Sequence, residues 1–403
     1  MSNDPLVVDP QMTSLLAAEE ERQARRIGLI ASENRISDRV RVCLGSVLSN
    51  KYAEGRPGNR YYGGCEIVDE IEKLCESRVL EAFGLSAEEW GVNCQPLSGT
   101  PANLAAYLAL LNPGDSILGM DLSCGGHLTH GYVPASGRHI TGVSKIFKTS
   151  TYKTNPTTDL LDLDIIESAI IENKPDLVVA GASAYPREID FNAIGNLAAK
   201  HGAKFMADIS HISAFVAAGT HQSPFTCSAT SAVMTTTHKT LGGPRGALLF
   251  FRKNLAKSFH EAVFPGVQGG PHLATIAAIT THMLDVLSPS FKEDYVAKIH
   301  QFTRSMCTIF SNNSVKMVTD GSDNHIIVID TGSAGFLGKV FEAELLKSNI
   351  ECSVSCVPGD KSPMNPGGVR IGIQGLVRRG VDADFIDQLA NKIASTYNKL
   401  KVN

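Results

Sequence analysis

The sequence lacks an excess of positive charge, a hydrophobic run long enough to cross a bilayer, and any internal repeat. Its 37 lysines and arginines are outnumbered by 41 acidic residues, which gives a net charge of −4 at neutral pH. No block of basic residues is present, so a nucleic-acid-binding surface is not expected. The longest apolar runs, such as Leu104 to Leu111, are far shorter than the roughly 20 residues of a membrane helix. We therefore expect neither nucleic acid nor a membrane as a partner.

Signals for export and for disulfide bonding are also missing. The first residues, MSNDPLVVDPQ, lack the basic start and the apolar core of a secretory signal. The nine cysteines are odd in number and irregularly spaced, which is typical of reduced thiols in the cytoplasm. Cys352 and Cys356 are four residues apart, but no second ligand pair accompanies them. We predict a cytoplasmic protein without a metal site.

What is present is the composition of a compact enzyme and a regular alternation of elements. Hydrophobic residues make up 43% of the 403 residues and charged residues 19%, as in folded globular proteins. Short apolar strands are expected at 116–120, 176–182, 203–208 and 231–236, separated by helical stretches. Continuous apolar strands that alternate with helices predict an α/β fold with a mainly parallel sheet, covered on both faces.

The two ends of the chain differ from this central region. Residues 1–30 contain a polar, helix-prone segment that we interpret as an N-terminal arm. We expect a large domain over 31–285 and a smaller C-terminal α/β domain over 286–403. A long helical region over 272–312, broken at Ser288–Pro289, joins the two.

The stretch MTTTHKTLGGPRG, from Met234 to Gly246, places Lys239 between an apolar strand and two glycine-rich turns. A second apolar run, Ala247 to Phe251, follows. Most lysines are exposed, so a surface loop is the ordinary interpretation. Ligands of doubly wound sheets, however, bind at the carboxyl ends of the strands, and Lys239 is placed there.

Other polar residues also follow predicted strands. Asp208 ends one of them, where it either points into the crevice or caps a helix. Ser183 follows another strand. Ser98-Gly99-Thr100-Pro101 opens a helix whose free N–H groups and dipole favour phosphate, although most such starts only cap.

His127 lies among glycines in CGGHLTHG, so its imidazole can approach a flat ligand closely. A metal site with His130 is the alternative, and it lacks a matching carboxylate or thiolate. Pyridoxal phosphate requires a Schiff-base lysine, a carboxylate at the pyridine nitrogen and a phosphate cradle. Lys239, Asp208 and the helix start at Ser98 together predict this cofactor.

Seven longer motifs resemble those of the serine hydroxymethyltransferases, which are fold-type I pyridoxal phosphate enzymes. The motifs are LIASEN (29–34), NKYAEGRPGNRYYGGCE (50–66), GGHLTHG (125–131), AGASAY (180–185), TTTHKTLGGPRG (235–246), AVFPGVQGGP (262–271) and GVRIG (368–372). The resemblance implies a large domain with a mainly parallel, mixed seven-stranded sheet and a smaller C-terminal α/β domain. It also implies hydroxymethyl transfer between serine and glycine, with tetrahydrofolate as the one-carbon carrier.

The resemblance assigns roles at the cofactor. It implies that Lys239 forms the Schiff base, Asp208 pairs with the pyridine nitrogen, and His127 stacks on the ring. His211 would contact the phenolic oxygen, with Ser183 nearby. The remaining implied cofactor contacts are Ser98, Gly99, Thr100, Thr236, His238 and Arg245, with Tyr52, Gly269 and Gly270 from a neighbouring subunit. An obligatory homodimer, or a dimer of such dimers, follows from that sharing.

Substrate roles are implied as well. Arg370 would clamp the amino-acid carboxylate in bidentate geometry, which lysine cannot reproduce. Ser32 and Tyr62 would assist, and Glu54 would act as acid/base near the hydroxymethyl group and folate. The implied folate contacts are Tyr61, Leu122, Gly126, Leu128 and Ser355.

Several residues depart from the family pattern. Gly242 and Leu97 replace an arginine and a histidine, Cys124 replaces a histidine, and Arg56 replaces a tyrosine. In the segment that reads the pterin, Ser355 replaces an asparagine and Met364 an aromatic residue, and Ile373-Gln374 replaces the common Thr-Pro. These departures leave open a folate-independent aldolase acting on threonine or another β-hydroxy amino acid, and a non-catalytic paralogue. The retained Glu54, Tyr61 and Tyr62 favour hydroxymethyl transfer.

Overall fold

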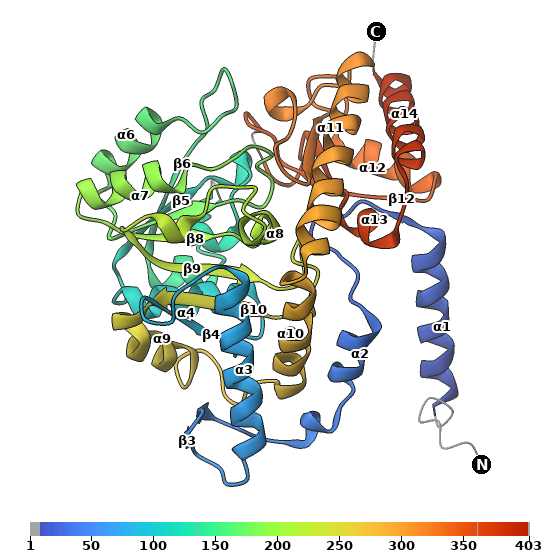
Figure 1. The fold of residues 1–403 in the computed structure, drawn as a ribbon. Coiled ribbons are helices and arrows are strands. Elements are labelled where there is room, and N and C mark those ends of the chain that lie inside the picture. The colour runs from blue at the N-terminus through green and yellow to red at the C-terminus, as the bar shows by residue number, and fades with distance from the viewer. Residues whose placement is uncertain (1–8, 135, 361, 402–403) are drawn as a thin grey trace.

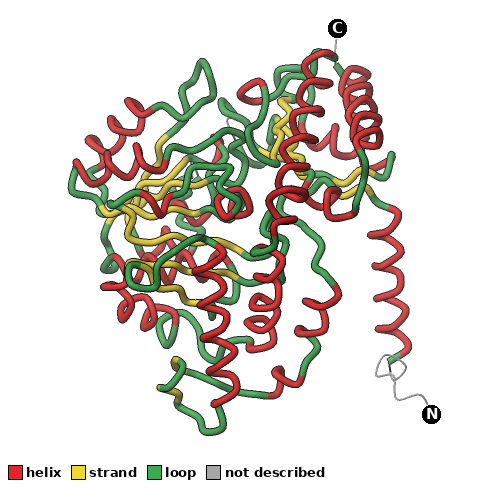
Figure 2. Tube along the Cα trace, in the orientation of Figure 1, coloured by secondary structure: helices red, strands yellow, loops and turns green. Residues whose placement is uncertain are grey.

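The structure is a computed structural model that describes residues 9–134, 136–360 and 362–401. Figure 1 shows a large sheet-and-helix body, a smaller body formed by the C-terminal segment, and helix α1 extending beside them. Figure 2 shows most of the strands gathered into two separate groups, with helices around each.

The large body is built on a seven-stranded sheet with the order β4-β10-β9-β8-β7-β5-β6. β10 is antiparallel to both of its neighbours, and the other neighbouring pairs are parallel. The strands are β4 (Trp90–Asn93), β5 (Ser116–Met120), β6 (Lys148–Tyr152), β7 (Leu177–Gly181), β8 (Lys204–Asp208), β9 (Thr230–Thr236) and β10 (Ala247–Arg252). The expected mainly parallel, mixed seven-stranded sheet is confirmed.

Helices cover both faces of this sheet. Successive strand residues point to opposite faces, so Val178 and Ala180 join one hydrophobic core while Leu177 and Val179 join the other. The helices of this body are α2 (Asp38–Leu44), α3 (Glu66–Ala82), α4 (Gly99–Leu110), α5 (Gly142–Ile146), α6 (Leu163–Asn173), α7 (Phe191–Lys200), α8 (Ser213–Ala217), α9 (Ala256–Val263) and α10 (Leu273–Val286). Burial on both faces explains the continuous apolar strands of the sequence.

The smaller body contains an antiparallel sheet in the order β11-β14-β13. Its strands are β11 (Ile326–Asp330), β13 (Ser353–Ser355) and β14 (Gly368–Gly372), and its helices are α11 (Ala297–Asn312), α12 (Gly338–Lys347), α13 (Gln374–Arg379) and α14 (Ala383–Leu400). The helical region expected over 272–312 consists of α10, a π-helix (Phe291–Val296) and α11, and its expected break at Ser288–Pro289 falls between the first two.

Short elements complete the fold. β1 (Ile27–Gly28) pairs in parallel with β12 (Ile350–Glu351), and β2 (Gly55–Arg56) forms a hairpin with β3 (Asn59–Arg60). The 3₁₀ helices are η2 (Val47–Asn50), η3 (Leu122–Cys124), η4 (Leu128–His130), η5 (Pro224–Thr226), η6 (Lys253–Leu255) and η8 (Val318–Asp320).

Helix α1 (Pro10–Arg25) buries none of its residues. Arg22, in the last turn of α1, forms an ion pair with Glu351 at 2.5 Å. Met12, Leu15 and Leu16 form an exposed apolar stripe on the same helix. Within the described part of the chain, no helix combines the length and the apolar character that crossing a membrane requires.

Candidate active site

A cavity of about 530 Å³ lies at the carboxyl ends of the central parallel strands. Asp208 is the last residue of β8, Lys239 follows the end of β9 by three residues, and Ser183 follows β7 by two. The sequence-predicted residues that line the cavity are Ser32, Ser98, Gly99, Thr100, Leu122, Gly126, His127, Leu128, Ser183, Asp208, His211, Thr236, His238, Lys239, Arg245 and Arg370. The ends of β7, β8 and β9 thus place Ser183, Asp208 and Lys239 at one cavity, as the topology of such a sheet requires. Ser32 from a loop and Arg370 from β14 of the smaller sheet join them there.

Asp208 is held ionised by its neighbours. Its Oδ2 accepts hydrogen bonds from Asn103 Nδ2 and His130 Nε2, both at 3.0 Å, and its Oδ1 accepts one from the backbone N–H of Ser210 at 3.0 Å. Burial alone would raise the pKa of this carboxyl, but the His130 hydrogen bond and the charges of His130 and Lys239 hold the pKa far below its ordinary range. A buried carboxylate therefore faces the cavity.

Two of these partners were not assigned a role at the carboxylate from the sequence. Asn103 lies one helical turn beyond the start of α4, and His130 had been weighed only as a metal ligand with His127. No cluster of metal-binding side chains occurs among the described residues. The only sequence signal was the spacing of His127 and His130, whose rings lie 5.5 Å apart.

The side-chain amine of Lys239 has a lowered pKa. Burial lowers the pKa of its amine, Asp208 opposes this shift, and the charges of Arg370 and Arg245 add to it, so that the pKa is about 8. Its backbone carbonyl accepts a hydrogen bond from Asn34 Nδ2 at 2.7 Å. The amine is therefore a nucleophile near neutral pH.

Burial favours the neutral form of two imidazoles of the cavity, those of His127 and His211. Burial lowers the pKa of His127 to about 4, and its Nδ1 lies 2.6 Å from Thr129 Oγ1. Burial also lowers the pKa of His211 well below its usual value. His211 Nδ1 contacts His325 Nε2 at 3.4 Å, and His325 Nε2 lies 3.3 Å from the carbonyl oxygen of Ala31. His325 is a further residue that the sequence did not reveal.

Arg370 extends from β14 of the smaller sheet into the cavity. Its Nη1 donates to the carbonyl oxygen of Ser183 at 2.7 Å, while its buried Nε has no partner in the described part of the chain. Burial lowers the pKa of the guanidinium to about 10, so it remains charged at neutral pH. A buried guanidinium with free donors fits an anion such as a carboxylate.

The helix start at Ser98 forms the other end of the cavity. Ser98 is the N-cap of α4, and its side chain makes no capping hydrogen bond. A Cβ at Gly99 would lie 2.8 Å from Thr236 Cγ2, so the close approach requires glycine. Thr236 Oγ1 and His238 Nδ1 are buried, with no partner among the described residues. Free N–H groups, a hydroxyl and Arg245 together suit a phosphate.

The other predicted residues form a second group that does not line the cavity. The Glu54 carboxylate accepts hydrogen bonds from the hydroxyls of Tyr52 at 3.3 Å and Tyr62 at 3.2 Å. A Cβ at Gly269 would lie 3.1 Å from Glu54 Oε1, and one at Gly270 would lie 2.9 Å from the Tyr52 ring. We call these five residues the tyrosine–glutamate cluster. Its tyrosines are about half exposed, at 53% for Tyr52 and 45% for Tyr62.

The residues that we expect to contact folate are divided in the same way. Leu122, Gly126 and Leu128 line the cavity. Tyr61 packs its ring edge-on against Phe264 at 5.6 Å and is 74% exposed. Ser355 ends β13, outside the cavity lining, and its hydroxyl donates to the Cys356 carbonyl oxygen at 3.2 Å.

Two of the departures from the family pattern, Gly242 and Cys124, have local explanations. Gly242 adopts a positive φ of 84°, and a Cβ there would lie 3.0 Å from Nη2 of Arg378. Arg378 from α13 thus occupies the space beside Gly242, three residues after Lys239. Cys124 is buried, and its sulfur accepts hydrogen bonds from the N–H and hydroxyl of Thr154 at 3.4 Å. Met364 is 83% exposed, and nothing in the structure explains its identity.

Comparisons with known proteins identify the family of this chain. The family model described as serine hydroxymethyltransferase matches residues 6–393. The chain is 43% identical to a mitochondrial serine hydroxymethyltransferase of Saccharomyces cerevisiae, over 96% of this chain and 81% of the relative. It is 42% identical to chloroplastic serine hydroxymethyltransferase 3 of Arabidopsis thaliana, over 94% and 72% of the two chains. A cytosolic relative from Aspergillus fumigatus is 41% identical over 98% and 86%.

Nothing in these comparisons favours the folate-independent aldolase. The chain belongs to the serine hydroxymethyltransferase family, and it is a pyridoxal-phosphate-dependent transferase that moves a hydroxymethyl group between serine and glycine with tetrahydrofolate as carrier.

Proposed function

We propose that the cavity around Lys239 binds pyridoxal phosphate and the amino acid, with the residue roles expected from the sequence. The observation that carries this proposal is that one cavity contains an amine with a pKa of about 8 and a carboxylate held ionised. Lys239 would bind the aldehyde, and Asp208 would pair with the pyridine nitrogen. His127 would lie against the ring, and His211 would donate to its phenolic oxygen.

The charges and the unpartnered polar atoms of the cavity fit the cofactor. Thr236 Oγ1 and His238 Nδ1, which have no partner among the described residues, lie with Arg245 near the N-terminus of α4. Ser98, Gly99 and Thr100 would supply N–H groups to the phosphate at that end. When bound, pyridoxal phosphate withdraws electrons from the amino acid as its Cα–Cβ bond breaks.

The protein contributes positioning and proton control. Asp208 Oδ1 and Oδ2 stay ionised and can hold a proton on the pyridine nitrogen across the physiological pH range. Arg370, whose Nε is free, would bind the carboxylate of serine, with Ser32 beside it. Glu54 would accept or return the proton of the substrate hydroxyl. Tyr62 donates to the Glu54 carboxylate at 3.2 Å and keeps it oriented.

The test uses the apo-protein and pyridoxal phosphate. We expect the reconstituted protein to show the visible absorption of the bound cofactor and to convert serine and tetrahydrofolate to glycine. Lys239→Ala should abolish both the absorption and the incorporation of cofactor after borohydride reduction. Covalent incorporation that persists in Lys239→Ala would refute the assignment.

We also propose a homodimer in which the tyrosine–glutamate cluster of one subunit completes the cavity of the other. Two features support it: the cluster is half-exposed and outside the cavity lining of its own chain, and the stripe Met12, Leu15 and Leu16 is uncovered. Tyr61, which lies in the same segment as Glu54 and Tyr62, would also meet the cavity wall of Leu122, Gly126 and Leu128 in this assembly.

Subunit mixing tests the shared site. Lys239→Ala and Glu54→Gln subunits should each be inactive, or nearly so, as homodimers. Random re-association of equal amounts leaves about a quarter of all sites free of both substitutions, so about a quarter of the wild-type activity should return. No recovery, with mixed dimers confirmed by mass, would show that the sites are not shared.

The division into an arm over 1–30, a large domain over 31–285 and a small domain over 286–403 remains a proposal, and the first eight residues lie outside the described part. The confinement of the seven-stranded sheet to residues 90–252 supports it. A cytoplasmic location is likewise proposed. Cytosolic relatives support it, although mitochondrial and chloroplastic relatives also exist, and fractionation of cells tests it.

A further inference from the structure

The backbone on both sides of Glu54 is fixed by three consecutive hydrogen bonds. The carbonyl oxygen of Ala53 accepts from Arg60 Nη1 at 3.0 Å, and that of Gly55 accepts from the same atom at 2.8 Å. The Glu54 carbonyl accepts from the N–H of Tyr61 at 3.2 Å. Gln95 Nε2 adds a second bond to Gly55 at 2.9 Å. The Glu54 side chain accepts hydrogen bonds from the hydroxyls of Tyr52 and Tyr62.

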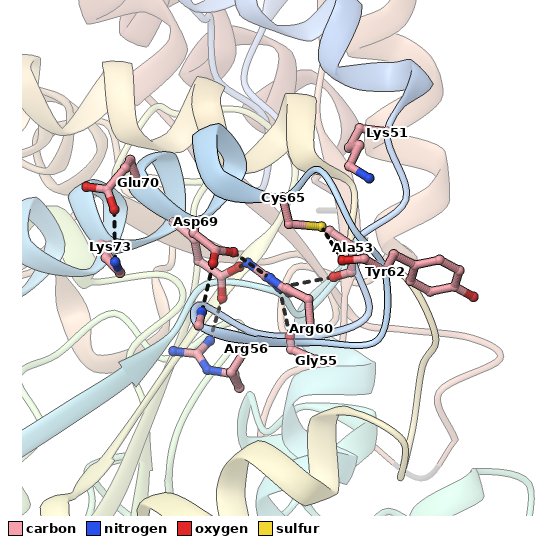
Figure 3. A network of polar contacts seen from close by, with 12 residues as sticks. Lys51, Ala53, Gly55, Arg56, Arg60, Tyr62, Cys65, Asp69, Glu70 and Lys73 are labelled. Atoms are coloured by element: carbon pink, nitrogen blue, oxygen red, sulfur yellow. Dashed lines mark hydrogen bonds and ion pairs between the residues drawn. The ribbon is translucent and has the colours of Figure 1, made fainter.

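One buried carboxylate holds the groups that make these contacts. Glu72 of α3 is fully buried, at 0% exposure. Its Oε2 accepts from Arg60 Nη2 at 2.6 Å, and its Oε1 accepts from Gln95 Nε2 at 2.8 Å and Arg56 Nη1 at 2.5 Å. Arg60 Nε also binds Asp69 at 2.8 Å. Figure 3 shows Arg56 and Arg60 of the hairpin directed toward α3.

The same carboxylate is connected to the other parts of the site. The carbonyl oxygen of Gln95 accepts from Gln268 Nε2 at 2.7 Å, and Gln268 Oε1 accepts from the N–H of Leu97 at 3.2 Å. Gln268 immediately precedes Gly269 and Gly270, and Leu97 immediately precedes the helix cap Ser98. Glu72 is therefore connected, through Gln95 and Gln268, to two segments besides the Glu54 hairpin. One contains Gly269 and Gly270, and the other leads into Ser98; both contain residues expected to bind the phosphate.

We propose that Glu72 is a positioning residue for Glu54, acting through Arg60, Arg56 and Gln95. This inference rests on the acid/base role proposed for Glu54. Its physical basis is that a buried carboxylate with three donors allows one arrangement of those donors, and they in turn fix the hairpin backbone. Arg56, a departure from the family pattern, belongs to this hydrogen-bond network through its contact with Glu72. It also pairs with Glu76.

A double-mutant cycle tests the proposal on the reconstituted full-length enzyme. We expect Glu54→Gln to lower kcat for hydroxymethyl transfer about 100-fold, as for the loss of an acid/base group. Glu72→Gln should lower kcat about 10-fold through misplacement of Glu54. In the Glu54→Gln background, Glu72→Gln should have almost no further effect, because its target is already gone. The cofactor absorption should stay unchanged throughout.

The control is Glu70→Gln on the same helix, which removes an exposed carboxylate paired with Lys73 at 2.9 Å and should leave kcat unchanged. An equal loss from Glu72→Gln in both backgrounds would overturn the positioning role. An unchanged kcat in Glu54→Gln alone would instead overturn the role proposed for Glu54. If Glu72→Gln does not fold, Gln95→Met in the same cycle decides between these outcomes, because it removes only the contacts to Gly55 and Glu72.

Discussion

Nε2 of His130 lies 3.0 Å from Oδ2 of Asp208, and both side chains are buried. The carboxylate keeps its charge inside the protein because this imidazole and Asn103 donate to it. His130, which the sequence analysis considered as a metal ligand, is thus a partner of the carboxylate that we propose binds the cofactor.

His130→Phe should raise the pKa of Asp208, since the first of the interactions that lower it is removed. A carboxyl group whose pKa is lowered by folding stabilises the folded state at pH values above its ordinary pKa. This contribution is lost as the pH falls toward the lowered pKa of the folded state. The variant should therefore unfold at a higher pH on acidification and lose about 10-fold in activity. Acid titration followed by circular dichroism measures this, with the exposed His139→Phe as control. An unchanged acid midpoint would contradict the prediction.

The pKa of Lys239 predicts an alkaline effect on the apo-protein. The folded-state pKa of about 8 is below the ordinary 10.5, so between these values only the unfolded chain binds the proton. The free energy of unfolding should therefore rise with pH across this range. Lys239→Met removes the titrating group, so the variant should have a higher Tm than the parent protein. This difference in Tm should be largest at pH 7 and should shrink toward pH 10.5. The exposed Lys257→Met should show no such trend; a constant difference for Lys239→Met would refute the shift.

Arg370→Lys should raise the KM for serine about 100-fold, because an ammonium cannot reproduce bidentate contact with a carboxylate. The cofactor absorption should remain, since Arg370 is proposed to bind the amino acid and not the cofactor. Steady-state kinetics with serine measures the change, and the exposed Arg304→Lys serves as control. A KM within twofold of the parent would exclude Arg370 as the carboxylate ligand.

The contact between His211 and His325 predicts the tautomer of His211. A carbonyl oxygen only accepts, so His325 Nε2, 3.3 Å from the Ala31 oxygen, carries a hydrogen. His211 Nδ1, 3.4 Å from the same nitrogen, then accepts, and its Nε2 carries the hydrogen. Nitrogen NMR of the apo-protein should show this Nε2–H form, and His325→Phe should mix the two tautomers. A predominant Nδ1–H form in the parent would contradict the assignment.

The central fold was predictable from the sequence because strand burial leaves a local pattern. The apolar runs of β5, β7, β8 and β9 are continuous since both faces are covered. β6, with the sequence KTSTY, was not expected, because an edge strand that is largely half-buried or exposed carries no apolar run. The positions of Lys239 and Asp208 at the cavity were predictable because strand ends are local features, and the position of a strand end places the following residue at the sheet edge.

The sequence by itself determined the chemistry available: an amine, a carboxylate and a helix start that follow buried strands. Only the tertiary structure decided which side chains tune them. Asn103, His130 and His325 act across separations of 78 to 114 positions, and no local pattern records such contacts. The pKa of Lys239 likewise depends on burial among Arg370, Arg245 and Asp208. Desolvation and charge at short range exist only after the chain has folded, because folding creates the low-dielectric cavity in which these interactions are strong.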